Sequence, residues 1–366
     1  MYKRSWLWIL SVVFILGVAT AQTQDADAQA QEKKEPSVKA YLLVGDVYYS
    51  SGEYDAAMIA FRRALEKEPD NVYALYGLGR TQLRMLQFSA AIVNLKKAIA
   101  LDSKFVPAYV SLAQAYTDRY SYAEDKQTAA SFLDQALLIL EDAKRVDPNY
   151  YPIYNQQGLI YQYKGNLKKA EAAFKKALDL EPNDPIVHYN LAQVYLSQGK
   201  LDEALETLQK GVQLDPESAQ LQLLYGKALA VKGELAKAEE AFKKGAQLDP
   251  LNAGAWLSLG QVYYLEKKYD KAIEVLQTSI ELDPLSYPEA YFYLGRAYLA
   301  QGKKEEARSN FSKAVRLAPE NAEYHYWLAR SLLDLGQKAD AKLELEKALS
   351  LNPKHEAARK ALEELK

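Results

Sequence analysis

The 366-residue chain contains no cysteine. This absence excludes disulfides, thiolate metal sites and a cysteine nucleophile, and it is compatible with export to an oxidising compartment. Histidine is also scarce, because only three residues occur and none lies at metal-ligand spacing from a second histidine. We therefore expect neither a metal nor a cofactor.

An excess of charge of one sign is missing as well. The chain has 46 basic and 48 acidic residues, and the two signs are interspersed along it. Neutralising a phosphate backbone requires a basic stripe, so nucleic acid is not an expected partner. No nucleophile elbow or phosphate-binding glycine loop is present, and acidic pairs such as Glu239 and Glu240 fit the solvated face of a helix. We expect a protein that is not an enzyme.

The amino terminus differs in kind from the rest of the chain. Lys3 and Arg4 precede an apolar run, which ends in a small-x-small cleavage pattern at Ala21. Residues 1–21 are therefore predicted to be a signal peptide, and the alternative is an uncleaved anchor helix. Both interpretations place the remaining chain outside the cytoplasm, either in the periplasm or anchored to the inner membrane. Residues 22–37, which are poor in apolar side chains, are predicted to be a flexible linker.

What the rest of the sequence contains is a repeat. Eight prolines end similar dipeptides, and four consecutive gaps between them, from Pro148 to Pro284, are 34 residues long. Counting each proline as position 32 gives nine units, which begin at Val38, Val72, Val106, Tyr151, Pro185, Ala219, Ala253, Pro288 and Ala322. Position 20 is alanine in all nine units, and position 8 is always glycine or alanine. A repeat of this length predicts a solenoid.

The pattern inside each unit predicts two antiparallel helices. Apolar residues recur with helical spacing at positions 4, 7, 8 and 11 and again at positions 20, 24, 27 and 28. Small residues at positions 8 and 20 allow the two helices to cross closely, and the proline at position 32 ends the second helix. Because each hairpin leaves one apolar face uncovered, the units must stack. The expected fold is an all-α solenoid of helix hairpins.

One segment carries a family resemblance. YNQQGLIYQYKGNLKKAEAAFKKALDLEPND, from Tyr154 to Asp184, resembles the tetratricopeptide consensus almost residue for residue. The resemblance covers residues 38–355. It implies a right-handed superhelix whose first helices line a concave groove that grips extended or helical peptides.

Three parts of the chain depart from the regular pattern. The second unit has Leu86 where glycine is usual at position 15. The third unit carries 11 extra residues between Thr117 and Gln127, which we expect to lengthen both helices by five or six residues. This insertion is either a contact surface or a tolerated change at a surface tip. Residues 356–366 are predicted to form a capping helix that docks through Ala358, Leu362 and Leu365.

The resemblance also implies which residues would face the groove, namely positions 2, 5, 9, 12 and 13 of the first helices. The candidate partner-binding residues are Tyr73, Tyr76, Arg80, Arg84, Asn155, Tyr163, Tyr189, Gln193, Gln261, Tyr264, Phe292, Arg296, Tyr326 and Arg330. Arg80 and Arg84 share one helix face without an intervening acid, so they could accept a carboxylate. The Lys/Asn pair of chaperone-binding members is absent. His188 and His325, both at position 4, are expected to pack in the core.

These observations favour a non-catalytic scaffold or adaptor of the bacterial cell envelope. Its partners would be peptide segments of other proteins, bound along a groove rich in tyrosine and arginine. The alternative is a carbohydrate-binding solenoid in envelope polysaccharide export, in which the tyrosines stack on sugar rings. Membrane contact is expected only through the amino-terminal segment, if it is not cleaved.

Overall fold

The structure is a computed structural model, and it describes residues 36–365. The predicted signal peptide and nearly all of the predicted linker lie outside the described residues. Within residues 36–365 the regular structure consists of nineteen α-helices, α2 to α20. The first helices of the nine units are α2 (Val38–Ser51), α4 (Val72–Arg84), α6 (Val106–Ser121), α8 (Tyr151–Tyr163), α10 (Pro185–Ser197), α12 (Ala219–Lys232), α14 (Ala253–Leu265), α16 (Pro288–Ala300) and α18 (Ala322–Asp334).

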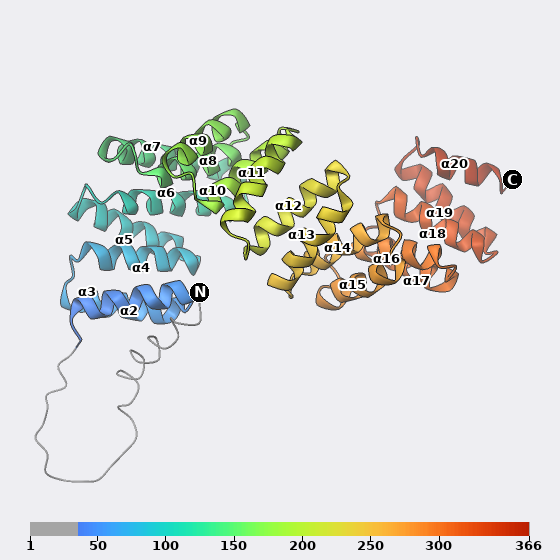
Figure 1. The fold of residues 1–366 in the computed structure, drawn as a ribbon, viewed down its shortest axis with the longest axis horizontal. Coiled ribbons are helices and arrows are strands. Elements are labelled where there is room, and N and C mark those ends of the chain that lie inside the picture. The colour runs from blue at the N-terminus through green and yellow to red at the C-terminus, as the bar shows by residue number, and fades with distance from the viewer. Residues whose placement is uncertain (1–35, 366) are drawn as a thin grey trace, which may run out of the picture.

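The second helices alternate with the first. They are α3 (Tyr54–Lys67), α5 (Phe88–Leu101), α7 (Lys126–Val146), α9 (Leu167–Leu180), α11 (Leu201–Leu214), α13 (Leu235–Leu248), α15 (Tyr269–Leu282), α17 (Lys304–Leu317) and α19 (Lys338–Leu351), and α20 (Glu356–Glu363) follows. Each first helix packs on its own second helix, and each second helix packs on the next first helix. The result is a long curved array in which the first unit and α20 lie at opposite ends (Figure 1). The predicted all-α solenoid of helix hairpins is confirmed.

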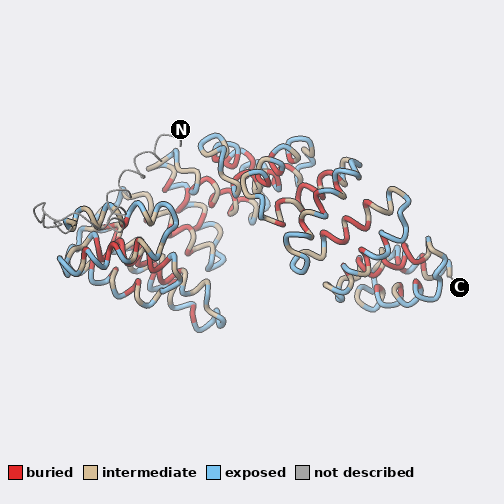
Figure 2. Tube along the Cα trace, turned by 90° about the horizontal axis from the view of Figure 1, so that it is seen from below, coloured by how far each residue is buried: buried red, intermediate tan, exposed pale blue. Residues whose placement is uncertain are grey.

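The core runs along the array as a series of buried clusters rather than forming one central cluster (Figure 2). The two helices of each unit cross where position 8 meets position 24, and the sizes of these two residues are matched in seven of the nine units. Phenylalanine at position 24 is always opposite glycine, in the pairs Gly45/Phe61, Gly158/Phe174, Gly226/Phe242 and Gly295/Phe311. Alanine at position 8 always accompanies leucine, in Ala113/Leu140, Ala192/Leu208 and Ala329/Leu345. Units two and seven instead combine the two smaller residues, in Gly79/Leu95 and Gly260/Leu276, so the crossing holds a similar volume in the other seven units only.

The turn between the two helices requires a left-handed residue at position 15. Glycine supplies it in six units, for example Gly165 with φ of +70°. Leu86 and Lys267 take its place in units two and seven, with φ of +60° and +61°. Because a side chain raises the energy of this conformation, the fold imposes the turn on both residues.

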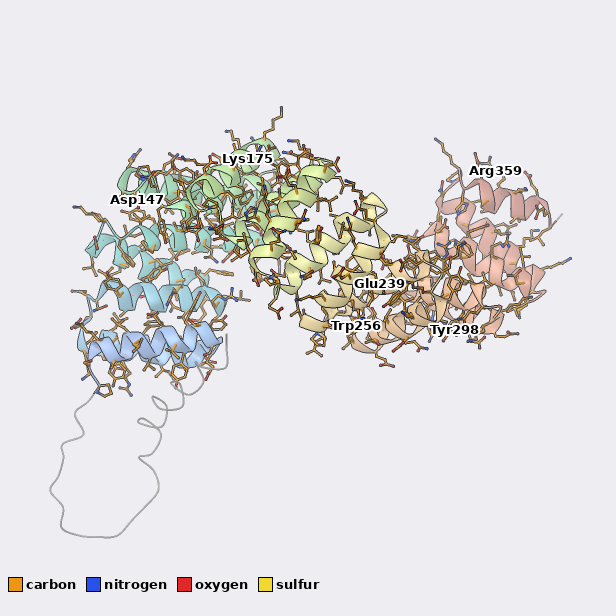
Figure 3. All side chains as sticks on the ribbon, viewed as in Figure 1. Asp147, Lys175, Glu239, Trp256, Tyr298 and Arg359 are labelled. Carbon is orange, nitrogen blue, oxygen red and sulfur yellow. The ribbon has the colours of Figure 1, made fainter. Side chains whose placement is uncertain are left out.

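A hydrogen bond joins each unit to the one before it. The side chain at position 4 donates to the backbone carbonyl at position 32 of the preceding unit, at 2.7–3.2 Å in units three to nine. The donors are Tyr109, Tyr154, His188, Gln222, Trp256, Tyr291 and His325, and Arg359 of α20 does the same for Pro353. Figure 3 labels Trp256 and Arg359. The carbonyl at position 32 lies just beyond the C-cap residue of the second helix, so no helix hydrogen bond satisfies it and a side-chain donor is needed.

The second unit, which lacks a donor at position 4, also satisfies the carbonyl at position 32 of the preceding unit. Leu75 occupies position 4 of the second unit and has no donor, and the carbonyl of Pro69 instead accepts a hydrogen bond from Lys97 Nζ at 3.0 Å. His188 and His325 are buried, as expected from their position. Their second role, as hydrogen-bond donors, could have been inferred from the sequence, because every residue at position 4 from unit three onward carries a donor.

We expect the donor at position 4 to be interchangeable. His188→Leu leaves the Pro182 carbonyl without a partner and should lower the free energy of unfolding by about 1–3 kcal/mol. His188→Gln keeps a donor of the kind found at Gln222 and should cost less than half as much. Urea unfolding of the two variants measures the difference, and equal losses would show that packing alone fixes this position.

The insertion in the third unit is divided unequally between its helices. α6 has 16 residues against 13 in α4, whereas α7 has 21 against 14 in α5. The prediction that both helices gain five or six residues was therefore wrong. The tip is closed by Asp125, which caps α7, and by Lys126, whose Nζ donates to the Tyr120 carbonyl at 2.9 Å. These local hydrogen bonds, rather than equal helix lengths, decide where the turn lies.

The carboxy-terminal end of the array is covered by α20. Ala358 and Ala361 are buried, and Leu362 and Leu365 pack against the same hydrophobic cluster. Glu363 is exposed on the opposite side. The amino-terminal end is different, because Leu43 and Val47 of α2 are 62% and 40% exposed. The equivalent positions of every later unit, which has a unit before it, are buried or partly buried.

Candidate functional site

The candidate site is the surface formed by the first helices. Neighbouring first helices contact one another from α2 to α16, whereas neighbouring second helices within residues 36–365 make no comparable contacts. The array therefore bends with the first helices on its inner side. We call positions 2, 5, 9, 12 and 13 of these helices the inner face.

The structure places the predicted binding residues in three environments. The exposed ones are Tyr73, Arg84, Tyr163 and Arg330. The partly buried ones are Tyr76, Arg80, Asn155, Tyr189, Gln193, Gln261, Tyr264, Arg296 and Tyr326. Phe292 is only 6% exposed and packs against Phe311 and Tyr324, so it belongs to the core and not to the accessible surface. Its large apolar ring is buried between units eight and nine, because burial removes the ring from water.

Arg80 has a partner within the chain. Its guanidinium pairs with the carboxylate of Asp46, which occupies the same position in the preceding unit. The guanidinium also lies over two rings, 4.2 Å from the centroid of Tyr49 and 5.3 Å from that of Tyr76. Arg84 donates from Nε to the hydroxyl of Tyr54 at 3.0 Å. The two arginines therefore do not form one open site, because the carboxylate that Arg80 binds comes from the neighbouring unit.

Asp118, at position 13 of the third unit, is an inner-face residue that the sequence analysis missed. Burial raises the pKa of its carboxyl from 3.8 to about 6, although a hydrogen bond from Gln114 and the charge of Arg84 act in the opposite direction. No ion pair with Asp118 is present among residues 36–365. The signal that could have found it is its register, which is the same as that of Arg84.

Several polar residues of the central units bind one another. Gln193 Nε2 donates to the hydroxyl of Tyr189 at 2.9 Å, and Asn190 Nδ2 donates to Asn155 Oδ1 at 3.0 Å. Burial raises the pKa of the Tyr189 hydroxyl, so this phenol is neutral and can both donate and accept. These groups form a polar, uncharged stretch in the middle of the inner face.

The carboxy-terminal units contain a cation surrounded by aromatic rings. The guanidinium of Arg296 lies 4.7 Å from the ring centroid of Tyr264, 4.6 Å from that of Trp327 and 5.6 Å from that of Phe292. Arg330 occupies the same position in the next unit and is exposed. Gln261, one unit earlier, is partly buried.

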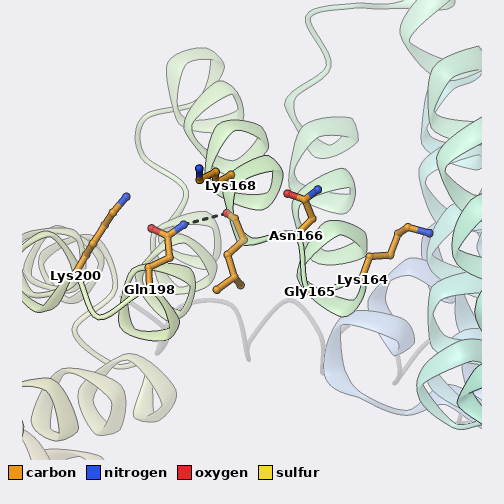
Figure 4. A pocket seen from close by; sticks show the side chains of 7 residues that line it. Lys164, Gly165, Asn166, Lys168, Gln198 and Lys200 are labelled. Carbon is orange, nitrogen blue, oxygen red and sulfur yellow. Dashed lines mark hydrogen bonds between the residues drawn. The ribbon is translucent and has the colours of Figure 1, made fainter.

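A separate hollow of about 650 Å³ lies at the turns of units four and five (Figure 4). Lys164, Lys168 and Lys200 line it, but Lys164 pairs with Asp134 at 2.7 Å and Lys200 with Glu171 at 2.8 Å. Hydrogen bonds from Lys175 and Lys200 lower the pKa of Glu171 to about 2. These pairs tie neighbouring units together, so we do not treat the hollow as the candidate site.

Within residues 36–365 the structure has neither a membrane-spanning helix nor a metal-binding cluster. No helix in this range is long and apolar enough to cross a membrane. No cluster of three or more histidine, aspartate or glutamate side chains in the same range is arranged to hold a metal ion.

The chain belongs to the tetratricopeptide-repeat family. A family model described as the C-terminal domain of cilia and flagella-associated protein 70 matches residues 151–365, and one described as the TPR repeat matches residues 45–85. A thermophilic TPR protein from Thermus thermophilus is 40% identical over 53% of this chain and 100% of its own, with a TM-score of 0.51. Members of this family are in general scaffolds for protein interactions and not enzymes.

Other comparisons are more distant. The BBSome complex member BBS4 of Xenopus tropicalis is 30% identical over 38% of this chain and 27% of its own. Superkiller complex protein 3 of Mus musculus is 26% identical over 30% of this chain and 7% of its own. The match thus spans about a quarter or less of these curated relatives. The structure of Pseudomonas aeruginosa pilF, 22% identical over 58% of this chain and 97% of its own with a TM-score of 0.52, shares the fold.

Proposed function

We propose that the chain is a non-catalytic scaffold that binds peptide segments of partner proteins along its inner face. The observation that carries this proposal is the line of side chains that the first helices, which contact one another from α2 to α16, present along the array. Tyr73 is 63% exposed and Tyr163 49% exposed. Tyrosine suits such a surface, because it offers a large contact area at a low entropic cost.

Site-specific photocrosslinking tests the proposal. A photoreactive phenylalanine analogue placed at Tyr73 or Tyr163 should form adducts with partner proteins in cells that produce the chain naturally. The matched control is the same analogue at Leu138, which is 68% exposed on the second helix α7. Adducts that form only from Leu138 would place binding on the outer side and contradict the proposal.

We further propose that the scaffold works in the bacterial cell envelope. Support comes from the sequence of residues 1–21, with its basic start, apolar run and small-residue cleavage pattern. The protein isolated from cells should begin at Gln22 and fractionate with the envelope. A cytoplasmic protein that retains Met1 would contradict this location.

A further inference from the structure

The inner face contains two arginine sites with the same construction. Arg80 and Arg296 both occupy position 9, in units two and eight. Each guanidinium lies over the ring at position 12 of the preceding unit, at 4.2 Å from Tyr49 and 4.7 Å from Tyr264 respectively. Each also lies over the ring at position 5 of its own unit, at 5.3 Å and 5.6 Å. In both arginines Nε is buried and has no hydrogen-bond partner, so a ligand from outside the chain can reach only the terminal nitrogens.

The two sites differ in whether a carboxylate of the chain binds the guanidinium. At the first, Asp46 at position 9 of the preceding unit supplies a carboxylate to Nη2 of Arg80. At the second, the equivalent residue is Gln261, which carries no charge. No acid within residues 36–365 forms an ion pair with Arg296. The site at Arg296 therefore has the cation and both rings of the Arg80 site, but it lacks the carboxylate.

The second site also has a third ring, which fixes the guanidinium more tightly. Trp327 lies 4.6 Å from the guanidinium, and its Nε1 donates to Glu323 at 2.7 Å. Glu323 is thereby engaged with the indole, and it also approaches the ring of His355 at 3.2 Å. The nearby acid thus positions the tryptophan and does not neutralise the arginine. A planar cation held between rings is preorganised to bind a carboxylate.

We propose that Arg296, with Tyr264 and Trp327, is a binding site for the aspartate or glutamate side chain of a partner peptide. The inference rests on the proposed function of the inner face, and it assigns the ligand chemistry of units seven to nine. The partner carboxylate takes the place that the Asp46 carboxylate has at Arg80. A side chain fits better than a chain terminus, because the inner face continues past Arg296 to the exposed Arg330, so a bound segment can run through the site.

The first test asks whether the site accepts a carboxylate, independently of any partner. Gln261→Asp places a carboxylate where Asp46 lies in the other site, and it should raise Tm by about 2 °C relative to Gln261→Asn. The gain should disappear in an Arg296→Gln background and shrink in high salt. If Gln261→Asp is no more stable than Gln261→Asn, the equivalence of the two sites is wrong and the inference fails.

The second test identifies the ligand, with a displayed library of random nonapeptides as the probe. Selection on the wild-type chain should enrich peptides with aspartate or glutamate at one fixed position. A selected acidic peptide should bind the Gln261→Asp variant roughly tenfold more weakly than the Gln261→Asn variant, because the introduced carboxylate already occupies the site.

The outcomes separate this inference from the proposed function. Peptides that are enriched without an acidic preference would support a peptide-binding inner face and overturn the assignment of Arg296. A preference that appears only when free peptides end in a carboxylate, and is lost in their amides, would overturn the side-chain assignment. No enrichment at all would contradict the proposed function, even if the stability test succeeds.

Discussion

Gly158→Ala is expected to lower the free energy of unfolding by about 2 kcal/mol. A Cβ atom at this position would lie 2.5 Å from the ring of Phe174, which is fully buried. Helix propensity alone favours alanine over glycine by about 1 kcal/mol, so a net loss would measure the steric overlap. Chemical denaturation of the purified protein gives this value.

The decisive control uses the size matching of the crossing. Phe174→Leu in the Gly158→Ala background recreates the Ala192/Leu208 pair of the next unit, so the double variant should be more stable than Gly158→Ala alone. Gly165→Ala is the contrasting control, because its φ of +70° makes it unfavourable although no atom lies within 4 Å of the added methyl group. Phe174→Leu should not rescue it. If the losses in free energy of unfolding caused by Gly158→Ala and Phe174→Leu simply add in the double variant, the size matching of positions 8 and 24 is contradicted.

Asp118→Asn is expected to stabilise the protein by about 1–2 kcal/mol at pH 7.5 and to have little effect near pH 4. Burial raises the pKa of Asp118 from 3.8 to about 6, so the folded state binds more protons than the unfolded state between these values. Stability conferred by this group is therefore highest at low pH and is lost as the pH rises to about 6. Asparagine removes the buried charge and retains a side chain that can hydrogen-bond to Gln114.

Thermal unfolding at several pH values tests whether Asp118→Asn stabilises the protein at pH 7.5 and not near pH 4. Asp179→Asn, on the exposed surface of α9, is the matched control and should change stability little at either pH. An Asp118→Asn variant that is less stable than the wild type at pH 7.5 would show that the carboxylate has a favourable partner. Because Asp118 lies on the inner face, a cationic partner group would also lower its pKa on binding.

The sequence predicts the helix hairpins well because their determinants are local and repeated nine times. The alanine at position 20, the small residue at position 8 and the proline at position 32 each act within one hairpin. The fold class needed no information beyond these positions. The division of the insertion between α6 and α7 was mispredicted, because it depends on the hydrogen bonds of Asp125 and Lys126 at one tip.

The candidate site was less predictable, because its contacts join different units. The pairing of Arg80 with Asp46 spans 34 residues and depends on how neighbouring first helices align. Burial of Phe292 depends likewise on the packing of unit eight against unit nine. Positions within a helix indicate which residues share a face, but not which of them the next unit covers.

The hydrogen bonds from position 4 also give the array a mechanical character. In units three to nine every unit is joined to the one before it both by packing and by a side chain that donates a hydrogen bond to the carbonyl at position 32. The units are thus connected in series, and a tensile force along the array acts on every interface between neighbouring units. Within residues 36–365 the first unit packs only on the second, and Leu43 and Val47 are open to solvent. The strength of the array under tension is therefore set by its weakest interface and not by its average stability.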